Sequence, residues 1–506
     1  MIKRHPVRSG ALSPERRARA ASLLLLLSLT LASCTSGLGL RQQELRDDSK
    51  APLPTAHGVP PRDAQGSGDT TYHSDTSRQS NGLGAASRQS DPLLGSNTEE
   101  PLDFERLTHL DRAAFIREVL TRNPSIEAAR HAWRAALAEH PQVSALPDPT
   151  VEYSSAPLTV GSDDVTYGQV VGLSQRFPWP GKLALKGKVA IAEAEASRHD
   201  YEATQQNLAL MASILFDQYR AATRSLELND EHRRLALDVK AAAEAQYEAG
   251  RASQQAPLQA EVEHAHVLHQ RVVLQARRAV IIAQLNGLLH RAPNEVLPPP
   301  AAWIEPAPRE LEASEVLQEQ ALENSPELLS SAARVRARES AVALAKREYY
   351  PDFAVKGSYN SLWAARDNRW LVGLSLNIPI QFGARNAATS QARARLASAR
   401  ARLAAADDAI RVEVERARQH LIEARHVVRL YDEQLLPAVR GQIEAAQIGY
   451  ETGRNGFQAL IDAERSLRTL EIEHQNAIAA YGQRAAELER AIGRIPGLSG
   501  QVGGVQ

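Results

Sequence analysis

The densest group of possible metal ligands in the sequence is one glutamate and three histidines within seven residues. Carboxylate and imidazole groups bind zinc and related cations when three or four of them converge on one point. On a helix, however, residues two positions apart point about 200° away from each other. Only His266 and His269 share a face, and two imidazoles make a poor site. We therefore predict a solvated helix surface, and no metal site, at Glu263, His264, His266 and His269.

Motifs of enzymatic chemistry are missing. The chain contains no G-x-S-x-G nucleophile elbow and no H-E-x-x-H zinc-protease motif, and no P-loop precedes Gly181-Lys182. The formal net charge of −1 gives no electrostatic basis for binding nucleic acid. The sequence therefore predicts no catalytic residue and no cofactor, and the function must come from the way the elements are arranged.

The start of the chain predicts secretion and lipid attachment. Basic residues precede an apolar run that is too short to span a bilayer, as in a secretory signal. The run ends in LASC, which resembles a bacterial lipobox, and Cys34 is the only cysteine. We predict a lipoprotein signal peptide over 1–33 and a lipid on Cys34. The lipobox resemblance also implies sorting to the outer membrane, since Thr35 is not the aspartate that causes inner-membrane retention.

The remainder is a tandem duplication between two flexible ends. YEAGR at 247–251 returns as YETGR at 450–454, and VGLS at 171–174 returns at 372–375. The separation between matching residues of the two copies changes only from 201 to 203 along the chain, so the matches occur in the same order in both copies. We predict repeats over 104–300 and 301–495, a disordered Ser/Gly-rich tether over 34–103 and a flexible tail over 496–506.

Each repeat changes its hydrophobic period in the same order, which predicts a helix, two strands, a very long helix, a turn and a helix. Apolar residues alternate with small or polar ones in the strands around 165–177 and 370–377, and more weakly in 150–155 and 353–360. Strands of about ten residues with one apolar face suit a transmembrane β-barrel. A half-buried sheet in a soluble domain is the alternative. The predicted lipid-facing residues are Val165, Tyr167, Val171, Leu173, Trp370, Val372, Leu374 and Leu376.

Four strands cannot close a barrel, and an open sheet edge in lipid leaves backbone groups unpaired at several kcal/mol each. The chain is therefore expected to oligomerise, and three copies would supply twelve strands.

The long helices are expected over 183–249 and 386–452, each about 100 Å at about 1.5 Å per residue. Pro437 predicts a kink in the second helix. A narrow apolar seam with solvated flanks indicates a wall of helices around water. The predicted seam residues of the second helix are Leu396, Ala399, Leu403, Ala406, Ile410, Val414, Ala417, Leu421, Ala424 and Val428; those of the first are Leu208, Met211, Leu215, Tyr219, Ala222 and Leu226.

The repeated YE(A/T)GR phrase marks the place where each long helix ends and a returning helix begins. Gly250 and Gly453 stand where a left-handed glycine closes a helix. The phrase therefore predicts two helical hairpin tips in each chain.

Together these features resemble the TolC family of outer-membrane efflux proteins over about 104–495. The resemblance rests on the duplicated unit, on LPDP at 146–149, on FPWPGK at 177–182 and on the glycine tips. It implies an α+β, mostly α, fold: a homotrimer with a twelve-stranded barrel in the outer membrane, continued by an α-helical coiled-coil tunnel across the periplasm. Such a duct is passive and is opened at its tip by a periplasmic adaptor protein.

The lipobox, LPDP and FPWPGK look most like channels paired with inner-membrane resistance-nodulation-division (RND) transporters, especially the heavy-metal branch of CzcC- and CusC-like proteins. The cargo expected from this branch is small toxic compounds, above all heavy-metal cations. A channel for type I secretion, driven by an ATP-dependent (ABC) transporter, stays open as an alternative. A purely structural coiled-coil lipoprotein is an alternative from another class.

The resemblance also assigns roles to residues. Asp462 and Glu464 are candidates for a periplasmic gate, although a salt-bridged or solvated helix face explains them equally well. Trp179 is expected to be an aromatic anchor near the membrane interface, and a binding pocket there is the alternative. The tip residues expected to contact the adaptor are Gly250, Arg251, Ala252, Ser253, Gly453, Arg454, Asn455 and Gly456.

Overall fold

The computed structural model describes residues 104, 106–161, 163, 167–302, 311–363 and 365–498. Cys34, the predicted signal peptide and tether over 1–103, Val165 and residues 499–506 of the tail lie outside the described residues. The described chain divides into two compact units. The first comprises Arg134–Ala192 and Ala337–Arg393, and the second comprises the remaining described residues. Helices α4, α5, α8 and α9 contribute residues to both units.

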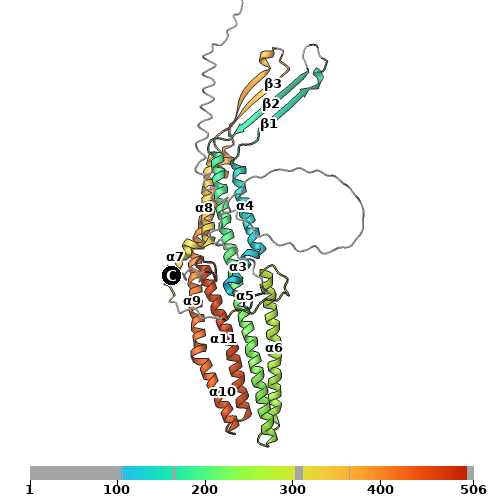
Figure 1. Cartoon of the computed structure of the whole chain (residues 1–506). Helices are drawn as coiled ribbons and strands as arrows, with labels where there is room; N and C mark the ends of the chain where they lie inside the picture. The colour runs from blue at the N-terminus through green and yellow to red at the C-terminus, as the bar shows by residue number, and fades with distance from the viewer. Residues whose placement is uncertain are drawn as a thin grey trace, which may run out of the picture. The chain divides into compact units, whose positions relative to one another are not determined.

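The first unit contains one antiparallel sheet in the order β1-β2-β3-β4, with one hairpin from each repeat (Figure 1). The strands are β1 (Thr150–Ala156), β2 (Gly168–Phe177), β3 (Asp352–Asn360) and β4 (Trp370–Asn377). The hairpins join through β2 and β3, where Phe177 lies opposite Phe353. All four strands coincide with the segments that alternate in the sequence, so this prediction is confirmed.

The second unit consists of helices and brings the two repeats together. The first-repeat helices that contribute to it are α3 (Arg112–Arg122), α4 (Pro124–Ser144), α5 (Lys182–Glu248) and α6 (Gln255–Leu288). Its second-repeat helices are α7 (Ser314–Asn324), α8 (Pro326–Arg347), α9 (Phe382–Leu430), α10 (Leu436–Glu451) and α11 (Phe457–Ala491). The two very long helices and the returning helices are therefore confirmed. Among the described residues, none of these helices is both long and apolar enough to cross a membrane.

Each repeat begins with two helices where the sequence pattern predicted one. The break falls at Asn123 and Ser325, each of which precedes a proline and adopts an extended backbone. The ring of a proline disfavours the helical conformation of the preceding residue, which explains both breaks. Asn123 Oδ1 then accepts the Ser125 N–H at 2.9 Å, and Ser325 Oγ accepts the Leu328 N–H at 3.4 Å.

Near Pro437, where the sequence predicts a kink, a π-helical turn, Tyr431–Leu435, lies between α9 and α10. Proline lacks the N–H that would bond to the carbonyl four residues earlier. A π turn is one of the known causes of such an interruption.

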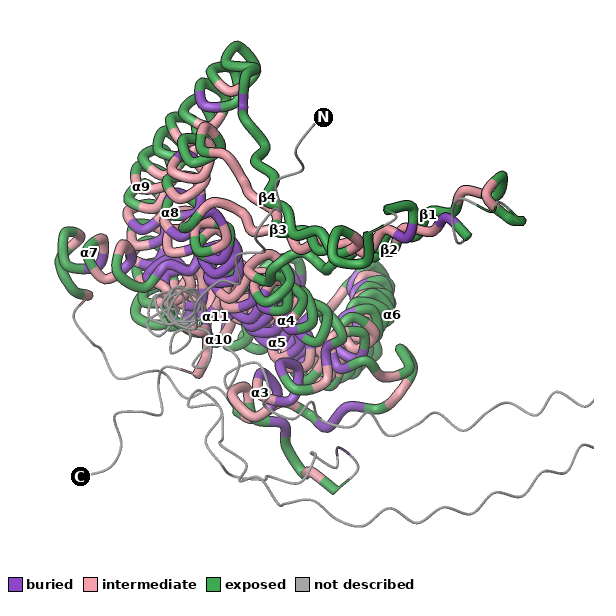
Figure 2. Tube along the Cα trace, turned by 90° about the horizontal axis from the view of Figure 1, so that it is seen from above, coloured by how far each residue is buried: buried purple, intermediate pink, exposed green. Residues whose placement is uncertain are grey.

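The predicted seam of the second long helix is the face that packs inward. Val414, Ala417 and Leu421 are buried against Leu488 and Ala491 of α11. Buried residues concentrate on α5 and α11, whereas α6 is largely exposed (Figure 2).

The first-helix seam was partly wrong, because Met211 is 53% exposed. The buried positions beside it are Ala209, Ala212 and Phe216. Alanine occurs on several faces of this helix, so periodicity alone did not fix its orientation.

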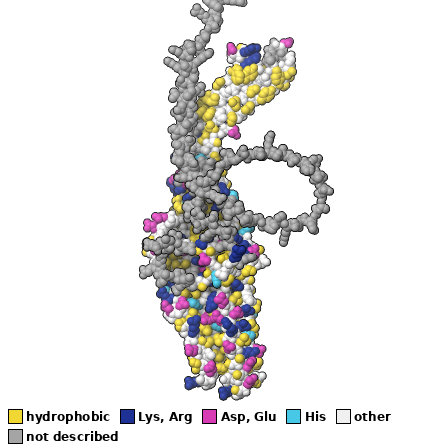
Figure 3. Space-filling model, viewed as in Figure 1, with side chains coloured by type: hydrophobic (Ala, Val, Ile, Leu, Met, Phe, Trp, Pro, Cys, Tyr) yellow, Lys and Arg dark blue, Asp and Glu magenta, His cyan; other side chains and the backbone are white. Residues whose placement is uncertain are grey.

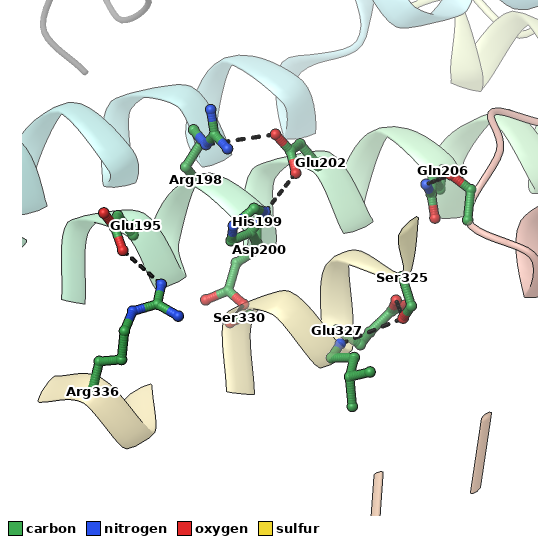
Figure 4. A network of polar contacts seen from close by, with 12 residues as sticks. Glu195, Arg198, His199, Asp200, Glu202, Gln206, Ser325, Glu327, Ser330 and Arg336 are labelled. Carbon is green, nitrogen blue, oxygen red and sulfur yellow. Dashed lines mark hydrogen bonds and ion pairs between the residues drawn. The ribbon is translucent and has the colours of Figure 1, made fainter. Parts of the chain in front are cut away.

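Polar contacts between α5 and α8 connect the two repeats within the second unit (Figure 4). Ser330 Oγ donates to Asp200 Oδ1 at 2.7 Å, and an Arg336 guanidinium nitrogen donates to Glu195 Oε2 at 2.7 Å. These bonds join segments more than a hundred residues apart, so they fix the register between the repeats.

Candidate functional sites in the sheet and at the helical tips

The strand register gives the sheet one apolar and one polar face. Directly opposed residues of an antiparallel pair point to the same side, and successive residues of a strand alternate. The register therefore places one set of mainly apolar residues on one side: Val151, Tyr153, Val171, Leu173, Phe177, Phe353, Val355, Tyr359, Trp370, Val372, Leu374 and Leu376. The other side carries mostly small or polar residues, although Val170 and Leu371 also lie there. Among the small or polar ones are Glu152, Ser174, Arg176, Lys356, Ser358, Gly373 and Ser375.

The apolar face is exposed in the described chain. Trp370, Val372 and Leu374 are 73%, 87% and 67% exposed, and hydrophobic side chains gather on the visible side of the sheet (Figure 3). Aromatic pairs stabilise it across strands, with ring centroids 5.4 Å apart for Phe177–Phe353. Apart from Val165, every predicted lipid-facing residue lies on this face or, for Tyr167, immediately before β2.

Both outer strands of the sheet have a free edge. Within the part of the chain that the structure describes, β1 pairs only with β2, and β4 pairs only with β3. One side of each outer strand therefore presents N–H and C=O groups that readily pair with another strand.

A compact polar contact at the FPWPGK motif joins the start of α5 to the start of β3. Lys182 is buried, and its Nζ donates to Asp352 Oδ1 at 2.9 Å, to Glu348 Oε2 at 3.2 Å and to the Tyr350 carbonyl at 3.1 Å. The Trp179 N–H donates to the same Asp352 oxygen at 2.8 Å, and the Trp179 ring stacks on Tyr350 with centroids 5.3 Å apart. The lysine thus fixes the end of β2 to the start of β3. The sequence pattern did not reveal this contact, although the FPWPGK motif was visible in it. The role of Trp179 at a membrane interface stays a prediction.

The two tips have the same hydrogen-bonded turn. Gly250 and Gly453 have φ angles of +65° and +70°, and their N–H groups donate to the carbonyls of Tyr247 and Tyr450. The next residue, Arg251 or Arg454, donates to the carbonyl five positions back, at 2.9 or 2.8 Å. This pair of bonds is the Schellman motif, which ends a helix at a left-handed glycine.

One pair of positions differs between the tips in a compensating way. At the second tip, a Cβ added to Gly449 would clash with the side-chain amide of Asn455. The corresponding residues at the first tip are Gln246 and Ala252, so the larger side chain is on the other partner. Each turn therefore accommodates one large side chain and one small residue.

Behind the tips, the two hairpins share one apolar core. Val239 and Ala243 of α5 pack with Ala256 and Ala260 of α6, together with residues of the second repeat: Ala446, Phe457, Leu460, Ile461 and Ala463. The eight predicted tip residues are exposed, except that Ala252 is half-buried against this core. The tips are thus surface turns on a packed four-helix base.

The two gate candidates lie in different surroundings. Asp462 is exposed, accepts a hydrogen bond from Gln458 at 2.9 Å and lies 4.0 Å from Arg465. Glu464 is fully buried, and neither of its carboxyl oxygens has a hydrogen-bond partner among the described residues. Burial raises the pKa of Glu464, an effect that nearby Arg468 only partly opposes.

The ligand-type residues of α6 do not form a metal centre in the part of the chain that the structure describes. The prediction of a solvated surface was wrong for Glu263, which is buried and accepts hydrogen bonds from Arg468 at 2.6 Å and Arg465 at 2.7 Å. Burial alone would raise its pKa, but the bonds from these arginines outweigh burial and lower it. His266 and His269 are exposed, as the helical spacing predicted.

A family model described as "Outer membrane efflux protein" matches residues 115–289 and 317–494. One similar relative is the cobalt-zinc-cadmium resistance protein CzcC of Cupriavidus metallidurans, 29% identical over 189 residues. A second is the outer membrane protein TolC of Vibrio cholerae, 23% identical over 200 residues. These alignments cover 36% and 37% of this chain, and 43% and 45% of the relatives, so the chain matches less than half of each.

Crystal structures of CusC show the same fold. The match has a TM-score of 0.66 at 17% sequence identity and covers 78% of this chain and 96% of the other.

Proposed function

Because the chain belongs to the outer membrane efflux protein family, we propose that it is the exit duct of a tripartite efflux pump in the outer membrane. The observation that carries this proposal is the uncovered apolar face of the sheet. In water, such a continuous exposed face is unfavourable, whereas in a bilayer it would contact lipid. The duct contributes no catalytic group, and the energy for export comes from its partner transporter.

The free edges of the sheet support a homotrimer. Unpaired backbone groups in lipid cost several kcal/mol each, so β1 and β4 need partners. Pairing β4 of one copy with β1 of the next satisfies both edges, and three copies give a closed barrel of twelve strands. Three copies would also present six helical tips.

The tips are the proposed docking surface for a periplasmic adaptor, through Gly250, Arg251, Ala252, Ser253, Gly453, Arg454, Asn455 and Gly456. Asp462 and Glu464 are the proposed gate residues; Asp462 is exposed close behind the second tip, whereas Glu464 is buried. A lipid on Cys34 would hold the chain at the membrane.

The proposed partner is an RND transporter, and the proposed cargo is heavy-metal cations. The printed name of CzcC refers to cobalt, zinc and cadmium resistance, which supports this choice. The test is to delete the gene and measure growth of the host in these three metals, with complementation by the wild-type chain. Unchanged growth in all three would contradict the cargo assignment.

Docking is tested by a photo-cross-linking residue at Ser253 in living cells, with partners identified by mass spectrometry. Ala276, which is exposed on α6 away from the tip, is the matched control position. An adaptor and an RND transporter cross-linked from Ser253 alone would support the proposal. An ATP-driven transporter would move the function to type I secretion, and no periplasmic partner would contradict docking.

A further inference from the structure

A buried carboxyl cluster lies where the two hairpins of the second unit meet. We define it as Glu263 of α6 with Glu464, Arg465 and Arg468 of α11. Glu263 and Glu464 are 1% and 0% exposed, and Arg468 is also buried. Because Glu263 comes from the first repeat and Glu464 from the second, the cluster is assembled only while the hairpins are packed together.

The hydrogen bonds of the cluster are unevenly shared. Both arginines donate to Glu263, at 2.6 and 2.7 Å. The nearest cation to Glu464 is Arg468, whose Nη1 is 4.0 Å from Oε1, which is too long for a hydrogen bond. Among the described residues, Glu464 is therefore the carboxyl group of this cluster that accepts no hydrogen bond.

None of the groups around Glu464 supplies a hydrogen bond in place of the water that burial excludes. They are Arg468 and Arg465 on its own helix, Glu263 on α6 and His232 on α5. His232 is engaged with Glu471 at 2.9 Å, and Arg440 of α10 bonds to the same glutamate at 3.3 Å. Tyr450 of α10 packs against the apolar core of the hairpins. A buried carboxylate without hydrogen bonds is strongly unfavourable, so burial shifts the equilibrium of Glu464 toward the neutral acid.

We propose that Glu464 carries a proton while the hairpins are packed and releases it when they separate, so that opening of the duct is coupled to deprotonation of this residue. The inference rests on the proposed function, because it assigns a regulation to the same helical tips. Water reaches the carboxyl group only after α6 and α11 move apart. Acid therefore favours the packed form, and alkali favours the open form.

The direction of this pH dependence follows from the ionisation of Glu464 in the packed and open forms. Below the ordinary carboxyl pKa, Glu464 is neutral in both forms and packing is unopposed. As the pH rises from there through the raised pKa of the packed form, the ratio of packed to open chains falls by up to about tenfold per pH unit. Glu263 acts in the opposite sense. Its pKa is lowered in the packed form, so its charged form stabilises packing, and this contribution is lost only as the pH falls through the lowered pKa.

The test uses the purified full-length protein in planar lipid bilayers, with the pH on the tip side varied from about 5 to about 9. The wild-type open probability should rise with pH, by about tenfold or more over this range. The Glu464→Gln variant should lose the rise, whereas Glu261→Gln, an exposed acid on α6, should keep it. If Glu464→Gln does not assemble, Glu464→Met removes the same acid and retains its bulk.

The outcomes separate this inference from the proposed function. If the open probability of the wild-type channel does not rise with pH, or if that of the Glu464→Gln channel still does, the inference is overturned and the proposed function as a duct is unaffected. Absence of any conductance from the wild-type protein contradicts the proposed function and the inference together.

Discussion

At the scale of single residues, the two tip glycines show how a backbone angle can decide a turn. Gly453 has a φ of +70°, and a Cβ added to it would meet no atom of the described chain. Glycine is therefore needed at position 453 for its backbone angle and not for lack of space. Any residue with a Cβ adopts the left-handed region at a cost of roughly 1–2 kcal/mol.

We expect Gly453→Ala to lower the free energy of unfolding by about 1 kcal/mol, measured by denaturant unfolding of the purified protein. Gly456 is the matched control: it lies in the same turn with open space around it, but its φ of −72° suits any residue. Equal losses for Gly453→Ala and Gly456→Ala would show that the left-handed angle is not the reason for the glycine.

At the scale of the elements, the two tip turns differ at one pair of positions, 246 and 252 in the first and 449 and 455 in the second. Gly449 makes room for Asn455 at the second tip, whereas the first tip has Gln246 and Ala252 at these two positions. We expect Gly449→Ala to destabilise the turn through this clash, by about 1–3 kcal/mol. In an Asn455→Ala background, the same change should be nearly neutral or stabilising, since alanine favours helix over glycine by about 1 kcal/mol.

A double-mutant cycle on unfolding free energies measures this coupling. Additive effects of the two substitutions would show that the positions do not compensate each other.

The sequence predicted the elements better than their contacts. Alternation located all four strands, and the repeated phrase located both tips, because these signals come from residues close together in the chain. The contact between Lys182 and Asp352, and the burial of Glu464 beside Glu263, join segments about 170 and 200 residues apart. No local pattern encodes such pairings. The predicted orientation of Met211 was wrong because the alanine-rich helix has several faces of similar apolarity, and the sequence pattern does not show which of them packs inward.

At the scale of the whole molecule, the two faces of the sheet should tolerate charge differently. Val372 is on the apolar face and Ser375 is on the opposite face of the same strand. We expect Val372→Arg to reduce assembly in the outer membrane, since arginine on the lipid face of a barrel costs roughly 2–4 kcal/mol near the midplane. Ser375→Arg should assemble almost normally.

The measurement is the amount of heat-resistant trimer in outer-membrane fractions. Normal assembly of Val372→Arg together with loss of Ser375→Arg would reverse the assignment of the faces.

The π turn before Pro437 has a consequence for the history of the duplication. From the VGLS phrase to the tip glycine, the second repeat is two residues longer than the first. A π turn contains one residue more than an α turn, so Tyr431–Leu435 absorbs one of the two. In an unbroken helix, each added residue would rotate everything beyond it by about 100°. The second copy could therefore gain a residue in its long helix without that rotation of the residues beyond the π turn.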